Sequence, residues 1–292
     1  MRIQLAMLRS IGRCTVGLLL AAAWTAAPGA RAEDMSGSIQ IKGSDTMVNL
    51  TQAWAEAFMT KHPGVSIAVT GGGSGTGIAA LISGTADLAA SSRKITPKEL
   101  SAAKAQGASP EELTVALDGL AVVVHPSNPA RQLTLQQLAD IFMGKTTSWD
   151  AAGGSKKPIV ILSREVNSGT HVYFKEHVLG AGNEFAPEAL LMPSSQAIAE
   201  EVAGNPAAIG YYGMGYNNER NALLAVARDA SGPFVSPNEQ TVRDESYPIS
   251  RPLFIYTRGE PAGAVKAFLE FAQSAEGQEV VRQNDFVPVA AR

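Results

Sequence analysis

Residues 65–82, VSIAVTGGGSGTGIAALI, place a glycine-rich loop directly between a strand pattern and a helix pattern. The β-branched residues 65–69 predict a strand, and residues 78–82 predict a short amphipathic helix. Glycines in the loop, residues 71–77, permit positive φ and let a ligand approach main-chain N–H groups closely. Such a turn at the start of a helix is typical of an anion site, whereas composition alone leaves a flexible linker open.

The spacing of this loop excludes two nucleotide-binding motifs. A P-loop ends in Gly-Lys-Ser/Thr, but Gly77 is followed by Ile78, so no lysine is in place to hold a phosphate group. The dinucleotide fingerprint G-x-G-x-x-G fails in every register, because Thr76 and Ile78 stand where its last glycine is needed.

The overall composition is that of an ordinary globular protein. The chain has 292 residues, of which 45% are hydrophobic and 17% charged, enough for one large domain or two modest ones. Residues 1–32 hold four of the 24 basic residues and none of the 27 acidic ones, so the remainder has a net charge of −7. Because there is no basic run, nucleic acid is not expected as a partner.

Residues 1–32 have the pattern of a cleavable export signal. Basic residues come first, an apolar run over residues 14–27 follows, and Ala30-Arg31-Ala32 matches an A-x-A cleavage site, which predicts cleavage after Ala32. A membrane anchor is the weaker interpretation, since the run is shorter than the ~20 residues needed to span a bilayer. Cys14, the one cysteine, lies inside this signal, so the mature chain is expected to lack disulfides and thiol chemistry.

Strand and helix patterns alternate along the rest of the chain, which predicts an α/β fold. Strands are expected over residues 38–41, 65–69, 87–90, 113–124, 158–162, 208–212, 223–226 and 251–256. Helices are expected over residues 47–61, 78–82, 133–142, 171–179, 194–203, 264–272 and 276–283, with another beginning at Pro97. The chain is expected to cross between two lobes twice, near residues 122–126 and near residues 246–250. One lobe would comprise residues 33–123 and 249–292, and the other residues 124–248.

A strand followed by a Ser/Thr-containing turn and a helix occurs three times. The turns are Gly43-Ser44-Asp45-Thr46, Gly73-Ser74-Gly75-Thr76 and Asn167-Ser168-Gly169-Thr170. Each is expected to present helix N-terminal N–H groups and a hydroxyl. For any one turn, simple N-capping is the plainer interpretation, with Ser44 or Asp45 as the cap of the first helix. Three such turns, together with Arg164 at the end of a strand, favour a shared oxyanion site.

In these features the chain resembles the phosphate-binding proteins of phosphate-specific ABC importers, in the shorter of their two length variants. The resemblance covers essentially the whole mature chain. It rests on the first turn extended through Met47, the glycine loop, Asp87-Leu88-Ala89-Ala90-Ser91-Ser92, Arg164-Glu165 with Ser168-Gly169-Thr170, and Tyr247-Pro248 with Arg251-Pro252-Leu253.

The resemblance implies a type II periplasmic binding protein with two lobes, each a mixed sheet flanked by helices, that closes on phosphate. Thr46 and Met47 would give N–H donors, Ser74 a hydroxyl beside the Gly75 N–H, and Arg164 the positive charge; Arg fits a tetrahedral oxyanion well. The full expected site comprises Ser44, Asp45, Thr46, Met47, Ser74, Gly75, Ser92, Arg93, Arg164, Ser168, Gly169 and Thr170. The implied protein is a periplasmic monomer without cofactor or metal, whose partners are inorganic phosphate and a membrane permease.

One position departs from the family pattern. Many members have an Asp after the third strand that accepts the proton of bound phosphate, and Ser92 stands there in this chain, followed by Arg93. Asp45 or the Ser92 hydroxyl could accept that proton instead, because a hydroxyl both donates and accepts. Arg93 is either a second cation for the ligand or part of a surface ion pair. Glu165 is expected to orient Arg164 rather than to bind the ligand.

Two other functions remain open. A binding protein for sulfate, molybdate or tungstate would use the same hydroxyl and N–H groups. A secreted phosphatase would need a nucleophile with an oriented base, and Ser168 with His171 supplies no third group. Neither serine turn fits G-x-S-x-G, and His171 and His177 are six residues apart, which is wrong for H-E-x-x-H zinc chemistry. The sequence therefore predicts a non-catalytic binding protein.

Overall fold

The computed structural model describes residues 35–290. The predicted export signal and its cleavage site therefore lie outside the described residues. Within them, no helix is long and apolar enough to cross a membrane.

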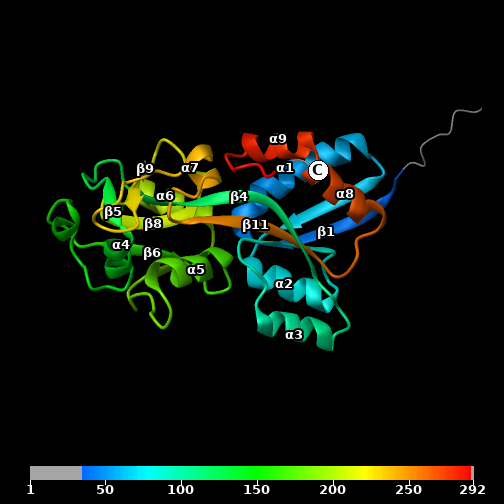
Figure 1. Ribbon diagram of the computed structural model, residues 1–292, viewed down its shortest axis with the longest axis horizontal. Helices are drawn as coiled ribbons and strands as arrows, with labels where there is room; N and C mark the ends of the chain where they lie inside the picture. Colours follow the sequence, from blue (N-terminus) through cyan, green and yellow to red (C-terminus); the bar gives the residue numbers. More distant parts are fainter. Residues whose placement is uncertain (1–34, 291–292) are drawn as a thin grey trace, which may run out of the picture. The chain divides into compact units, whose positions relative to one another are not determined.

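Nine strands in the described part form one mixed sheet, in the order β2-β1-β3-β11-β4-β8-β6-β7, with β9 paired to β4. Two long strands, β4 and β11, run antiparallel through its middle (Figure 1). The strands are β1 (Gly37–Gly43), β2 (Val65–Thr70), β3 (Leu88–Ser91), β4 (Glu111–Val124), β6 (Val160–Arg164), β7 (Leu190–Met192), β8 (Ala208–Gly213), β9 (Ala222–Leu223) and β11 (Ser250–Thr257). A separate parallel pair consists of β5 (Gln132–Thr134) and β10 (Ala225–Ala227).

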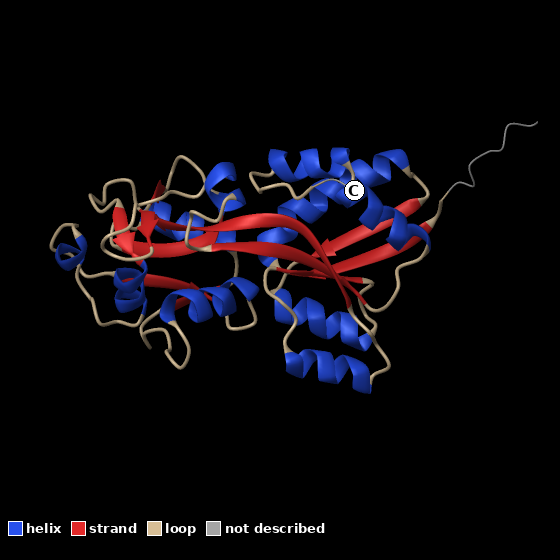
Figure 2. Ribbon diagram, viewed as in Figure 1, coloured by secondary structure: helices blue, strands red, loops and turns tan. Residues whose placement is uncertain are grey.

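Helices lie on both faces of the sheet (Figure 2). They are α1 (Val48–Lys61), α2 (Ser74–Ser83), α3 (Pro97–Ala105), α4 (Leu135–Phe142), α5 (Gly169–Phe174), α6 (Ser195–Gly204), α7 (Glu239–Arg243), α8 (Gly263–Gln273) and α9 (Ala275–Gln283). Shorter turns are the 3-10 helices η1 (Asp45–Met47), η2 (Trp149–Ala152) and η4 (Met214–Tyr216), and the π-helix η3 (Lys175–Leu179). Around β1 to β3, α2 and α3 cover one face and α1, α8 and α9 the other (Figure 1).

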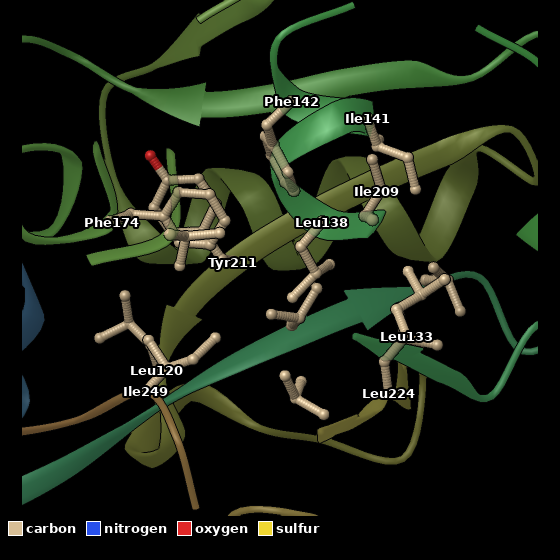
Figure 3. Close-up of a cluster of buried hydrophobic side chains, with 14 of the residues drawn as sticks. Leu120, Leu133, Leu138, Ile141, Phe142, Phe174, Ile209, Tyr211, Leu224 and Ile249 are labelled. Atoms are coloured by element: carbon tan, nitrogen blue, oxygen red, sulfur yellow. The ribbon is translucent and has the colours of Figure 1, made fainter. Parts of the chain in front are cut away.

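The buried hydrophobic side chains form separate clusters along the sheet. One cluster joins α1, α8 and α9 to β1, and a smaller one lies under α2 and α3. A third cluster surrounds the C-terminal half of β4. In it the Phe174 and Tyr211 rings stack with their centroids 3.9 Å apart, beside Phe142 (Figure 3). Within β4, Ala116 belongs to the first cluster and Leu120 to this third one.

The strand directions bring several turns to one place. Because β1 and β3 are parallel neighbours, their carboxyl ends, Gly43 and Ser91, lie side by side. Gly43 has φ 141°, and its lack of a side chain lets the Ser44 N–H donate to the Ala90 carbonyl at 2.7 Å. The turns that follow β1 and β3 therefore start in contact with each other.

Several element boundaries differ from the predictions. Helix α2 begins at Ser74, inside the glycine loop, because only Gly72 and Gly73 take positive φ there. Leu133 pairs with Val226 in a strand instead of starting a helix, since the Thr134 side chain caps α4. Residues 223–226 do not form one strand, because the pairing passes from β4 to β5 at Leu224. The sequence patterns also missed β7 and α7, both short.

The first helix is not capped as predicted. Ser44 precedes η1 without a side-chain capping bond. Its hydroxyl donates to Ser92 Oγ, and the Asp45 carboxylate accepts the Ser195 N–H. Both side chains therefore bond to residues distant in the sequence instead of capping the first helix.

Gly77 lets α2 pack closely on the end of β1, so Gly77→Ala is expected to destabilise the fold. A Cβ there would lie 2.8 Å from the Lys42 carbonyl carbon and closer still to Gly43 Cα. Overpacking against main chain should lower the free energy of unfolding by about 2–3 kcal/mol, measured by urea denaturation. The control is Gly204→Ala at the exposed end of α6, where a Cβ meets nothing within 4 Å. Equal stability of both variants would contradict this account of the packing.

Candidate functional site

Five buried hydroxyl groups meet where the predicted turns converge, and we call them the hydroxyl cluster: Ser44, Thr46, Ser74, Ser92 and Thr170, each at most 3% exposed. Ser44 Oγ donates to Ser92 Oγ at 3.0 Å, and Ser74 Oγ lies 3.4 Å from the same atom. Thr46 Oγ1 lies 2.8 Å from Thr170 Oγ1, although 124 residues separate the two along the chain. The cluster thus joins all three turns.

The second and third turns also bond directly to each other, once through their backbones and once through the Asn167 side chain. The Gly75 N–H donates to the Asn167 carbonyl at 3.0 Å, and Asn167 Nδ2 donates to the Gly72 carbonyl at 2.9 Å. Gly169 makes this approach possible, because a Cβ there would lie 2.7 Å from Ser92 Oγ and closer still to Ser74 Oγ.

Arg164 is buried beside the cluster and is held by protein groups. Its guanidinium lies 3.3 Å from Asp45 Oδ2 and donates to Ser195 Oγ at 2.9 Å and to the Pro193 carbonyl at 3.0 Å. Burial lowers the pKa of Arg164, and the Asp45 carboxylate opposes this shift. The guanidinium thus brings a positive charge with a fixed orientation next to the first turn.

The acid that orients Arg164 is Asp45, so the interpretation of Glu165 was wrong. Glu165 follows directly after β6 and is exposed. Neighbouring side chains of an extended chain point to opposite sides, so Glu165 cannot share the buried direction of Arg164. Asp45 comes from a turn 119 residues away, which chain proximity does not reveal.

Arg93 forms a bidentate pair with Glu99, at 2.9 Å and 2.7 Å. Burial acts to raise the pKa of Glu99, but hydrogen bonds from Arg93 and Thr96 outweigh it and lower that pKa. Arg93 Nε is buried and has no partner among residues 35–290. The pairing agrees with the ion-pair interpretation, and ligand contact by Arg93 stays a prediction.

Two groups of the expected site make hydrogen bonds within their own turns. The Met47 N–H donates to the Ser44 carbonyl at 3.0 Å, and the Met47 side chain is buried in the core around α1. Ser168 Oγ accepts the Thr170 and His171 N–H groups at 3.2 Å and 3.4 Å, which makes it the cap of α5. Ser168 therefore shapes the turn in the structure.

Sequence reasoning missed Arg251 and Asp118, which form a buried ion pair next to the cluster. Arg251 Nε and Nη2 donate to Asp118 Oδ2 at 2.9 Å and 2.7 Å. Nη2 also donates to Thr170 Oγ1 at 3.0 Å, and Nη1 to the Ser92 carbonyl at 3.1 Å. Burial raises the pKa of Asp118, and Arg251 opposes that shift. The available signal was a single charge within each of two apolar strand patterns.

The geometry does not assemble the serine–histidine dyad considered above. Ser168 Oγ accepts the main-chain N–H of His171, while His171 Nδ1 lies 2.8 Å from the Arg164 carbonyl and 3.3 Å from Ser163 Oγ. Burial lowers the pKa of His171. Across residues 35–290, no three His, Cys, Asp or Glu side chains gather in a way that could hold a metal ion.

Comparison with known proteins identifies the family. The PBP superfamily domain model matches residues 28–276. The phosphate-binding protein PstS of Pseudomonas aeruginosa is 34% identical over 284 residues, covering 90% of this chain and 86% of that one. The chain belongs to the PstS family. The PstS protein of Bacillus subtilis is 33% identical, over 88% of this chain and 82% of its own.

A solved structure supports the same assignment. A Clostridium perfringens protein described as a phosphate ABC transporter substrate-binding protein, solved with bound phosphate, superposes with a TM-score of 0.79 at 34% identity. The match covers 87% of this chain and 100% of that one. The PstS resemblance and the type II periplasmic binding protein fold predicted from the sequence are therefore confirmed.

Proposed function

We propose that this protein captures inorganic phosphate at the hydroxyl cluster and delivers it to the membrane permease of an ABC importer. The observation that carries the proposal is the convergence of three helix-starting turns on five buried hydroxyls in a PstS-family chain. Phosphate is the ligand named for the relatives. The protein would act as a non-catalytic monomer in the periplasm after cleavage behind Ala32.

Phosphate oxygens would take over hydrogen bonds that the hydroxyls make with one another. Thr170 with Thr46, and Ser44 with Ser92, form two such pairs. Bonds to a charged acceptor contribute roughly 1.5–3 kcal/mol each, more than bonds between neutral groups. A handful of these gains would therefore give micromolar or tighter binding, about −8 kcal/mol.

The separate hydrophobic clusters support two lobes that close around the ligand. One pair of clusters lies around β1, β3 and β11, and the other around β6 and β8. Leu120 packs with the second pair, so a boundary inside β4 fits these cores better than one after residue 123. The turn containing Asn167 and the turn containing Gly75 would then come from opposite lobes.

We infer that Ser92 is the group that accepts the proton of bound phosphate. Asp45 Oδ2 already accepts the Ser195 N–H at 2.7 Å and pairs with Arg164. Ser92 Oγ accepts from Ser44 and, as a hydroxyl oxygen, has a second lone pair. A hydroxyl at this position would suit the protonated form of phosphate as well as the fully charged one.

Calorimetry on mature protein freed of bound ligand is expected to show micromolar or tighter phosphate binding and much weaker sulfate binding. Phosphate at 100 times its Kd should also stabilise the fold by about 2.7 kcal/mol, seen as a raised Tm. Tighter binding of sulfate or molybdate than of phosphate would contradict the proposal and identify that oxyanion as the ligand. Hydrolysis of a chromogenic phosphate ester that is lost in Ser168→Ala would establish an enzyme instead.

A further inference from the structure

The Arg251–Asp118 pair is fully buried, and local stability does not account for it. The two residues are register partners in the antiparallel pair β11–β4, and they are 2% and 0% exposed. Removing two charges from water costs several kcal/mol, and well-packed apolar residues are often as stable as a buried pair. The pair therefore calls for a role beyond holding the two strands together.

Arg251 turns its remaining N–H groups toward the hydroxyl cluster. Nη1 donates to the Ser92 carbonyl at 3.1 Å, and Nη2 donates to Thr170 Oγ1 at 3.0 Å as well as to Asp118. Asp118 lies behind it on β4, and its Oδ1 accepts the Met214 N–H at 3.0 Å. The cationic end of the pair thus faces the site.

The bond from Arg251 fixes one role of the Thr170 hydroxyl, that of acceptor from the guanidinium. A guanidinium has no acceptor, so Thr170 Oγ1 must accept in this contact. This bond uses one lone pair and leaves the hydroxyl proton available to another acceptor. Thr46 Oγ1 lies within reach at 2.8 Å, where either hydroxyl could be the donor. An unprotonated oxyanion oxygen within reach of Thr170 Oγ1 can only accept, so Thr170 would donate to it, and the bond from a charged group polarises the hydroxyl and strengthens this donation.

We propose that Arg251, held by Asp118, is a positioning residue that orients the Thr170 hydroxyl and polarises it as a hydrogen-bond donor to a tetrahedral oxyanion. This role rests on the proposed function, because the oxyanion is the phosphate considered there. It also ties the end of β3 to the start of α5 through one side chain.

The test removes both charges together, because Arg251→Gln alone would leave Asp118 buried and unpaired. The double variant Arg251→Gln/Asp118→Asn is expected to bind inorganic phosphate ~30-fold more weakly by calorimetry, with native circular dichroism. The control Arg220→Gln/Glu200→Gln removes an exposed pair, 62% and 53% exposed, and should retain full affinity. Unchanged affinity in the first variant would overturn the role.

A double-mutant cycle with Thr170→Val separates positioning from a general structural effect. If Arg251 acts through Thr170, combining Thr170→Val with the charge-removed pair should weaken binding less than ~3-fold beyond the weaker parent, because coupled residues are non-additive. If the combined variant instead loses phosphate affinity by the product of the two separate fold losses, the residues act independently and the proposal is wrong.

Arg251→Lys covers the case in which the charge-removed pair does not fold. Lysine keeps the cation beside Asp118, but its one nitrogen lacks the fork that reaches Asp118, Ser92 and Thr170 together. A ~10-fold loss of phosphate affinity is expected, and no loss would overturn the role. If the unaltered protein binds no phosphate, the proposed function fails; if it binds and the variants bind equally well, only this inference fails.

Discussion

Arg164→Ala is expected to weaken phosphate binding by about 100- to 1,000-fold, which corresponds to about 3–4 kcal/mol. The buried guanidinium is the charge that the family resemblance assigns to the ligand, and Ser195, Pro193 and Asp45 hold it in place. The loss should appear in calorimetry as a raised Kd for phosphate.

The same substitution is also expected to reduce stability. Without Arg164, the Asp45 carboxylate loses its partner at 3.3 Å, and breaking such a pair costs about 3 kcal/mol. Asp45→Asn/Arg164→Ala should recover part of the free energy of unfolding but not the affinity. Phosphate affinity that is unchanged in Arg164→Ala would refute the assigned role.

Gly169→Ala is expected to abolish measurable phosphate binding at micromolar concentrations. The added Cβ would lie 2.7 Å from Ser92 Oγ and closer still to Ser74 Oγ. Both hydroxyls are buried, so relief of the overlap must turn them away from their present partners or separate α5 from the end of β3 and the start of α2. A misplacement of about 1 Å is enough to cost ~100-fold where geometry is tight.

The matched control is again Gly204→Ala, whose Cβ enters open space. It should bind phosphate as tightly as the unaltered protein. Calorimetry on Gly169→Ala and Gly204→Ala under the same conditions compares their phosphate affinities. A crystal structure of Gly169→Ala should show the turns moved apart. Full affinity in Gly169→Ala would show that the close approach of these turns is not needed for binding.

The secondary structure and the turns could be predicted to a large extent because they depend on local patterns. Apolar periodicity located α1, β4 and β11, and Thr96-Pro97 marked the start of α3 with its capping box. The glycine loop was identified as the start of a helix, although α2 begins inside it. Where short elements gain their stability from partners, as in β7 and β5, no local pattern was sufficient.

The candidate site was predictable in its residues but not in its contacts. Hydroxyl groups from all three turns do meet. The first two turns follow β1 and β2, which are parallel neighbours, whereas the third follows β6, which runs the opposite way and brings its turn to them from the other part of the sheet. The partners of the charged groups were not predictable, because Asp45 with Arg164 and Asp118 with Arg251 pair across more than a hundred residues. Spacing along a chain carries no information about such distances.

The sequence by itself determined the α/β fold, the family and the set of hydroxyl-bearing turns, because strand and helix periods and helix-starting turns are local properties. Only the tertiary structure decided how those groups are used. It pairs Arg164 with Asp45, makes Ser168 a helix cap, and places Arg251 behind Thr170. A buried charge must find its counter-charge wherever packing brings one near, so these choices are settled by the fold as a whole.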